Sequence, residues 1–143
     1  MIYRLALSVA VVVGAASLAV ADGIEPGLWK ITTRTESGGV TGPPHQNSKC
    51  LTPEQTGDLP TTFSPVGRTI NSECAPIERS FTGGKLTWRL VCKGQLDMEL
   101  TGEFNFDSPH HYTATVQTKA AMAGMVGVNS RDTLEGEWVS ACP

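Results

Sequence analysis

The sequence lacks the short patterns that most often identify an enzyme. It contains no G-x-S-x-G turn, no H-E-x-x-H pair and no phosphate-binding glycine loop. Its cysteines form no C-x-x-C pair, which argues against thioredoxin-like redox chemistry and against a zinc knuckle. Its basic residues are scattered singly, which argues against nucleic-acid binding and against attraction to anionic lipid. The sequence therefore predicts neither an enzyme nor a cofactor.

The start of the chain has the features of a secretory signal peptide. A basic residue, Arg4, precedes an apolar run over residues 5–20, and Ala19-Val20-Ala21 provides a small-x-small cleavage site before Asp22. The apolar run is too short, and too interrupted by small residues, for a permanent membrane span. We therefore predict a signal peptide over 1–21. Residues 22–143 are predicted to form one domain, with no membrane span, in the periplasm or outside the cell.

An unusually regular alternation predicts a strand over residues 96–106. The positions of one face are apolar or small: Leu96, Met98, Leu100, Gly102, Phe104 and Phe106. The residues between them are polar, and an alternation of this kind is typical of a strand with one face on a core and one face in water.

The neighbouring strands follow from the length of the turns. A strand over 85–92 continues the same apolar face if Lys93-Gly94-Gln95 is a three-residue hairpin loop. A five-residue loop over 107–111 pairs Phe106 with Tyr112. A two-residue Gly83-Gly84 turn joins the strand over 85–92 to an upstream strand that contains Ile77 and Phe81.

Four cysteines in an exported domain predict two disulfides, with three possible pairings. The hairpin register places Cys74 opposite Lys93, one residue from Cys92, and a bulge or strand end at Pro76 would bring the two cysteines together. We therefore expect a Cys74–Cys92 bridge, which leaves Cys50–Cys142 to fix the C-terminus.

The remaining elements are a first strand over 27–35, a short strand that ends at Cys50, and a last strand over about 131–139. Thr52-Pro53-Glu54-Gln55 has the N-cap, proline and capping-box residue of a helix that ends near Gly57, and 58–72 is predicted to be a turn-rich loop. The predicted fold is all-β: an antiparallel meander of about seven strands, curled into a barrel or half-barrel, with one short helix and two disulfides.

Three segments resemble a known family. Gly27-Leu28-Trp29-Lys30-Ile31-Thr32 is similar to the opening of the DUF3617 domain, and Cys50-Leu51-Thr52-Pro53-Glu54 is similar to its C-L-T-P-E motif. Leu86–Cys92 resembles its aromatic strand that ends in cysteine, and Cys142 matches the closing cysteine of the family. The resemblance implies a small exported domain of Gram-negative bacteria, without an agreed activity and without catalytic residues to carry over.

His110-His111 is the first candidate for a site. Neighbouring residues on a strand point in opposite directions, so both rings could bind one metal ion only if the backbone bends, as it can in the predicted loop. Zinc sites use three or four protein ligands, and the sequence offers no third one nearby. The pair therefore fits either a surface loop or a metal-binding or pH-sensing role.

The uncharged segment 120–128 is the second candidate. Met122 and Met125 could bind Cu(I) through their thioethers, together with Met98 or a histidine. The same segment could instead be a packed strand, a lid over an apolar ligand, or a contact surface for an envelope protein.

Two other groups have an ordinary structural interpretation beside a functional one. Acidic residues follow the outer face of the predicted long strand and could bind Ca²⁺ or act as paired carboxylates, or simply face water: Asp97, Glu99, Glu103 and Asp107. Trp29, Trp88 and Trp138 lie on inward strand faces and fill a core, or line a cavity if the sheet closes.

The sequence favours a non-enzymatic binding or interaction module, with a small apolar ligand or an envelope protein as its partner. The alternative is a metal-binding protein or small exported enzyme that uses His110 and His111 or Met122 and Met125.

Overall fold

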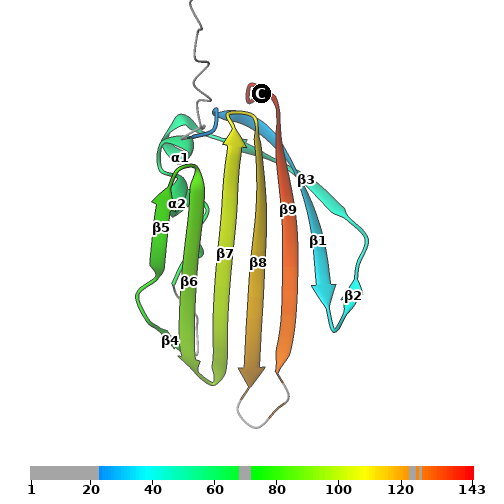
Figure 1. The fold of residues 1–143 in the computed structure, drawn as a ribbon, viewed down its shortest axis with the longest axis vertical. Coiled ribbons are helices and arrows are strands. Elements are labelled where there is room, and N and C mark those ends of the chain that lie inside the picture. Colours follow the sequence, from blue (N-terminus) through cyan, green and yellow to red (C-terminus); the bar gives the residue numbers. More distant parts are fainter. Residues whose placement is uncertain (1–22, 68–71, 123–124, 126) are drawn as a thin grey trace, which may run out of the picture.

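A computed structural model describes residues 23–67, 72–122, 125 and 127–143, so the predicted signal peptide lies outside the described residues. Within them, nine strands form one antiparallel sheet, and two short helices lie near one end of it (Figure 1). The elements are β1 (Gly27–Ser37), β2 (Val40–Thr41), β3 (His45–Leu51), α1 (Pro53–Gly57), α2 (Leu59–Thr62), β4 (Ser72–Cys74), β5 (Glu78–Thr82), β6 (Lys85–Gly94), β7 (Leu96–Ser108), β8 (His111–Met122) and β9 (Val128–Ser140).

The sheet is open. Its strand order is β2-β1-β9-β8-β7-β6-β4, with β3 also paired to β1 and β5 also paired to β6. Because β2 and β4 end this order without pairing to each other, the predicted closure into a barrel is not confirmed. The all-β class is confirmed, with nine strands in place of about seven.

Most of the predicted hairpin register is confirmed. Phe106 lies opposite Tyr112, and Phe81 lies opposite Leu86. The turn between β5 and β6 contains Gly83 and Gly84 with φ angles of 58° and 73°, which glycine adopts without steric cost. Two consecutive positive φ angles match the twist of the strands they connect.

The loop between β6 and β7 differs from the prediction. Cys92 lies opposite Met98, where a three-residue loop would place it opposite Leu96. β6 runs on to Gly94 because Ser72 pairs with that residue, and the Asp97 carboxylate accepts a hydrogen bond from the Gly94 amide at 3.1 Å. The shift is two residues, so every side chain keeps the face predicted for it.

Both predicted disulfides are present, Cys50–Cys142 and Cys74–Cys92. Cys74 lies directly opposite Cys92, whereas β5 begins with Glu78 opposite Arg89, so the register shifts by one residue across the segment that contains Pro76. A proline cannot donate a ladder hydrogen bond, which explains why the strand is interrupted there.

The predicted helix α1 is confirmed together with its cap. The Thr52 hydroxyl accepts from the Gln55 amide, and the Gln55 side chain accepts from the Thr52 amide. The prediction of a loop over 58–72 is wrong in part, because that segment contains α2 and the first residue of β4. The Asp58 carboxylate caps α2 by accepting from the Thr61 amide at 3.3 Å, and a proline lies in its first turn.

The main buried cluster lies at one end of the sheet, the end near the helices, which we call the helix end, and Leu90 and Cys92 are also buried, on β6 toward the opposite end. Phe63, the residue after α2, packs against three aromatic rings of the sheet with centroid distances of 5.2 to 5.3 Å. Its carbonyl accepts a hydrogen bond from the Trp88 indole at 2.8 Å. The buried cluster consists of Ile24, Trp29, Leu51, Leu59, Leu86, Trp88, Phe104, Phe106, Tyr112 and Ala114.

Two glycines let aromatic rings lie flat on the sheet in this core. A Cβ atom on Gly102 would overlap the Trp88 indole, and a Cβ atom on Gly136 would overlap the Tyr112 ring. Neither glycine has a positive φ angle, so the requirement there is space and not backbone conformation. A large ring over a strand glycine restores the packing that the missing side chain would supply.

Candidate functional site

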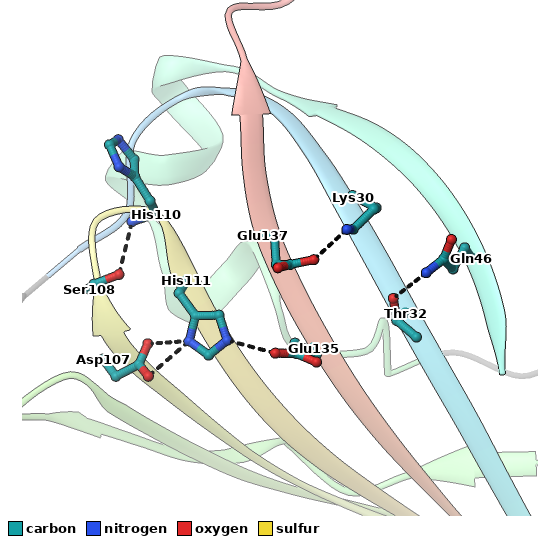
Figure 2. Close-up of polar contacts among 9 residues, drawn as sticks. All are labelled: Lys30, Thr32, Gln46, Asp107, Ser108, His110, His111, Glu135 and Glu137. Carbon is teal, nitrogen blue, oxygen red and sulfur yellow. Dashed lines mark hydrogen bonds and ion pairs between the residues drawn. The ribbon is translucent and has the colours of Figure 1, made fainter.

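The two adjacent histidines lie at the turn between β7 and β8, but their rings point apart (Figure 2). The His110 Nε2 atom lies 2.9 Å from Glu25, and its ring stacks on Trp138 with a centroid distance of 4.8 Å. His111 is the first residue of β8. Its ring lies on the outer face of the sheet, between Asp107 and Glu135. The structure therefore does not bring the two rings to a shared site.

His111 is held by a carboxylate at each ring nitrogen. Nδ1 lies 2.7 Å from Asp107, and Nε2 lies 3.1 Å from Glu135. The hydrogen bond with Glu135, and then the one with Asp107, raises the pKa of His111 above its ordinary value. When the ring is protonated, both of its N–H groups can donate, one to Asp107 on β7 and one to Glu135 on β9. His111 then links β8 to both neighbouring strands.

Further polar pairs lie beside His111 on the same outer face of the sheet, toward β1 and β3 (Figure 2). Lys30 on β1 pairs with Glu137 on β9 at 2.6 Å, and Gln46 on β3 donates to Thr32 on β1 at 3.2 Å. The ion pair raises the pKa of Lys30 and lowers the pKa of Glu137. Cross-strand pairs of this kind are ordinary stabilising contacts of a solvated sheet face.

The histidine–carboxylate cluster does not have the form of a metal site. In the described part of the chain, no group of three or more histidine, cysteine, aspartate or glutamate side chains is placed to hold a metal ion. Asp107 and Glu135 each occupy a ring nitrogen of His111, so neither nitrogen faces a position that the other ligands could share.

The acidic row of β7 is paired with cations. Asp97 lies 3.5 Å from Lys93, while Glu99 lies 3.2 Å from Arg89. Glu103 lies 3.1 Å from Lys85. The hydrogen bonds with Arg89 and Lys85 lower the pKa of Glu99 and of Glu103, respectively, so both carboxyl groups stay ionised. This is the arrangement of a solvated, charge-paired face, and it lacks the raised pKa that a general acid needs.

The three tryptophans pack on the core. Trp29 and Trp88 are buried, and Trp138 is half-buried against the same cluster. Each indole nitrogen donates to a backbone carbonyl: Trp29 to Glu25, Trp88 to Phe63 and Trp138 to Pro26. The predicted role in core packing is confirmed.

The opposite end of the sheet carries an apolar surface that the core does not include. On β7, buried and exposed residues alternate only from Gly102 onward, whereas 96–101 are half-buried on both faces. Strand register places five apolar residues on the inner side there, and we call them the open face: Leu96, Met98, Ala120, Met122 and Val128. Met122 is 56% exposed and Val128 is 61% exposed.

The candidate segment 120–128 contains the end of one strand and the start of the next. Residues 120–122 finish β8 and Val128 begins β9. Met125, whose amide donates to the Met122 carbonyl at 3.0 Å, is 66% exposed, and 123, 124 and 126 lie outside the described residues. The described residues of the segment continue the strands, as one of the alternatives predicted, and the side chains of Met122, Met125 and Val128 are exposed.

The shallow hollows of the described surface lie mainly over the outer face. One is lined by Thr32, Arg34, Thr113, Ala114, Thr115, Thr133, Leu134 and Glu135, and another by Thr101, Gly102, Glu103, Thr115, Gln117 and Arg131. Their walls mix polar and charged groups with apolar ones, and these hollows lie over the sheet and not between the sheet and the helices.

Sequence reasoning missed two features of these sites. Glu135 binds His111 although it lies opposite Thr113, because Glu137, which does lie opposite His111, is held by Lys30. The second feature is the open face, which the alternation over 96–106 predicts to be part of the core. Alternation shows which side of a strand is apolar, but it does not show whether another element covers that side. A signal was available: one short predicted helix is too little to cover the full length of the sheet.

The chain matches a known family. A family model described as a protein of unknown function, DUF3617, matches residues 24–142. No curated protein and no solved structure matches the chain significantly. Neither helix in the described residues has the length and apolarity that a membrane crossing requires. Because the family model spans nearly all of the predicted mature domain, the chain belongs to the DUF3617 family.

Proposed function

We propose that the chain is an exported, non-enzymatic interaction module, and that its contact surface is the open face. One observation carries this proposal: the inner side of the sheet is apolar along its length, but the main buried cluster lies at the helix end, and Met122 and Val128 on the inner side of the opposite end are exposed. Apolar area that leaves water on binding contributes roughly 25 cal/mol per Å². Exposed apolar surface of this kind marks interaction sites in soluble proteins.

The partner we propose is a protein of the cell envelope with an apolar surface of its own. The hollows of the described surface lie mainly on the other side of the sheet, so the open face offers a broad contact and not a pocket for a small molecule. Methionine side chains adapt to different apolar shapes, and Met98 and Met122 contribute to this surface.

Two further observations support the proposal. The two disulfides fit an oxidising compartment, which agrees with export to the periplasm. The paired carboxylates of β7 and the enclosed ring of His111 favour a structural role for the groups that an enzyme would use as acid or base.

Site-specific photo-crosslinking in intact cells tests the proposal. A photoreactive residue at Met122 or Val128 probes the open face, and one at Gln117 or Asn129 probes the outer face of the same strands. We expect one discrete protein adduct from the two open-face positions and none from the outer face. Met122→Glu should remove the adduct formed from position 128, with an unchanged melting temperature because the side chain is exposed.

Each other outcome contradicts the proposal. An adduct of twice the chain mass identifies a second copy as the partner, and a lipid-sized adduct identifies a small apolar ligand. Equal adducts from both faces, or none from the open face, show that this surface has no specific partner.

A further inference from the structure

The methionines are gathered at one place in the fold. The sequence has four, and the three that follow Met1 are Met98, Met122 and Met125. Met98 lies opposite Ala120 on the inner side of the sheet, and Met122 is two residues further along β8 on the same side. Such diagonal neighbours are close enough for long side chains to meet.

Met125 lies three residues after Met122, and its amide donates a hydrogen bond to the Met122 carbonyl at 3.0 Å. This hydrogen bond keeps Met125 at the end of the sheet where Met98 and Met122 lie. Met98 is half-buried on its strand, while Met122 and Met125 are 56% and 66% exposed. The Met98 side chain is therefore largely packed, whereas those of Met122 and Met125 are open to solvent.

The chemistry of the surroundings favours a soft monovalent ion. Thioether sulfur is a soft ligand that selects Cu(I), whereas carboxylates and water suit hard cations. The other soft ligands of this chain, its cysteine sulfurs, are consumed in the two disulfides. The open face has no charged side chain among its five residues, so a hard, strongly hydrated cation would gain little there.

We propose that Met98, Met122 and Met125 form a binding site for Cu(I) with three thioether ligands. The two adjacent histidines take no part, because the β7–β8 turn that contains them lies at the helix end of the sheet, whereas β8 ends and β9 begins at the opposite end (Figure 1). The site rests on the sulfur atoms alone and is independent of the protein partner proposed above.

The test is an anaerobic competition for Cu(I) between the purified mature domain and a chromophoric Cu(I) chelator. We expect the domain to withhold one equivalent of Cu(I), and the methyl NMR signals of all three methionines to shift. Each Met→Leu substitution should weaken binding on the order of tenfold. The triple Leu variant should bind none, and it should still fold because leucine conserves volume.

Matched variants show whether the methionine sulfurs are the ligands. His110→Ala with His111→Ala should leave Cu(I) binding unchanged. Failure to withhold Cu(I), or equal retention by the triple Leu variant, would overturn the proposal. The triple Leu variant keeps the open face apolar, so it should still form the protein adduct described above, and the two proposals can fail separately.

Discussion

Gly102, the glycine of β7 that lies beneath the Trp88 indole, should tolerate a methyl group poorly. A Cβ atom there would overlap three atoms of the indole ring. The ring cannot move freely, because its nitrogen donates to the Phe63 carbonyl at 2.8 Å and the residue is only 6% exposed. Gly102→Ala must therefore displace Trp88 or separate β6 from β7.

The cost can be worked out from these contacts. Overpacking a filled core costs about 1–3 kcal/mol, and loss of the indole hydrogen bond adds about 1 kcal/mol. We expect Gly102→Ala to lower the free energy of unfolding by about 2–4 kcal/mol, and the melting temperature by roughly 10 °C. Gly57→Ala is the matched control, since its Cβ would meet no atom within 4 Å and we expect no loss of stability.

A double-mutant cycle with Trp88→Phe, followed by thermal and urea unfolding, checks the cause. The smaller ring lacks indole atoms that the new methyl group would strike, so Gly102→Ala should cost much less in the Trp88→Phe background than in the wild type. Equal losses in both backgrounds would show that the indole does not occupy the space above Gly102, and would refute the reasoning.

Other contacts give three more measurable expectations. Replacing the Cys50–Cys142 bridge with alanines should cost about 4–5 kcal/mol in urea unfolding, against about 3 kcal/mol for Cys74–Cys92, because it closes the longer loop. His111→Gln should lower stability by up to about 1 kcal/mol at acidic pH. Because its folded pKa is raised, that difference should disappear as the pH rises above about 6.5 and through the raised value. Thr52→Ala should cost about 1 kcal/mol by removing the α1 cap, seen as a lower unfolding midpoint.

The predictable part of the fold is local. Alternation over 96–106 predicts the long strand, and turn lengths predict the Phe106–Tyr112 pair, because the period of a strand makes each face a matter of odd or even spacing. The Cys74–Cys92 bridge follows in the same way, once Pro76 is allowed to shift the register. These inferences need only neighbouring segments of the chain.

The unpredicted part depends mainly on segments that are distant in the sequence. α2 is the exception: it was missed although Asp58 and the proline two residues later are start signals, since a helix of four residues has no apolar period. Closure of the sheet depends on whether its first and last strands meet, and no pattern inside one strand encodes that. His111 contacts Glu135 because Glu137, the residue directly opposite it, forms an ion pair with Lys30 on β1.

The open end of the sheet has few buried side chains, Leu90 and Cys92 of β6 among them, and other contacts add to its stability. At that end the Cys74–Cys92 bridge joins β4 to β6, and Lys93 pairs with Asp97 across the β6–β7 turn. The ladders from β6 to β9 run unbroken through the same region. The exposed side chains of Met122 and Val128 contribute little burial to the stability of this end. A charged substitution at Met122 should therefore alter what the domain binds and leave its stability nearly unchanged.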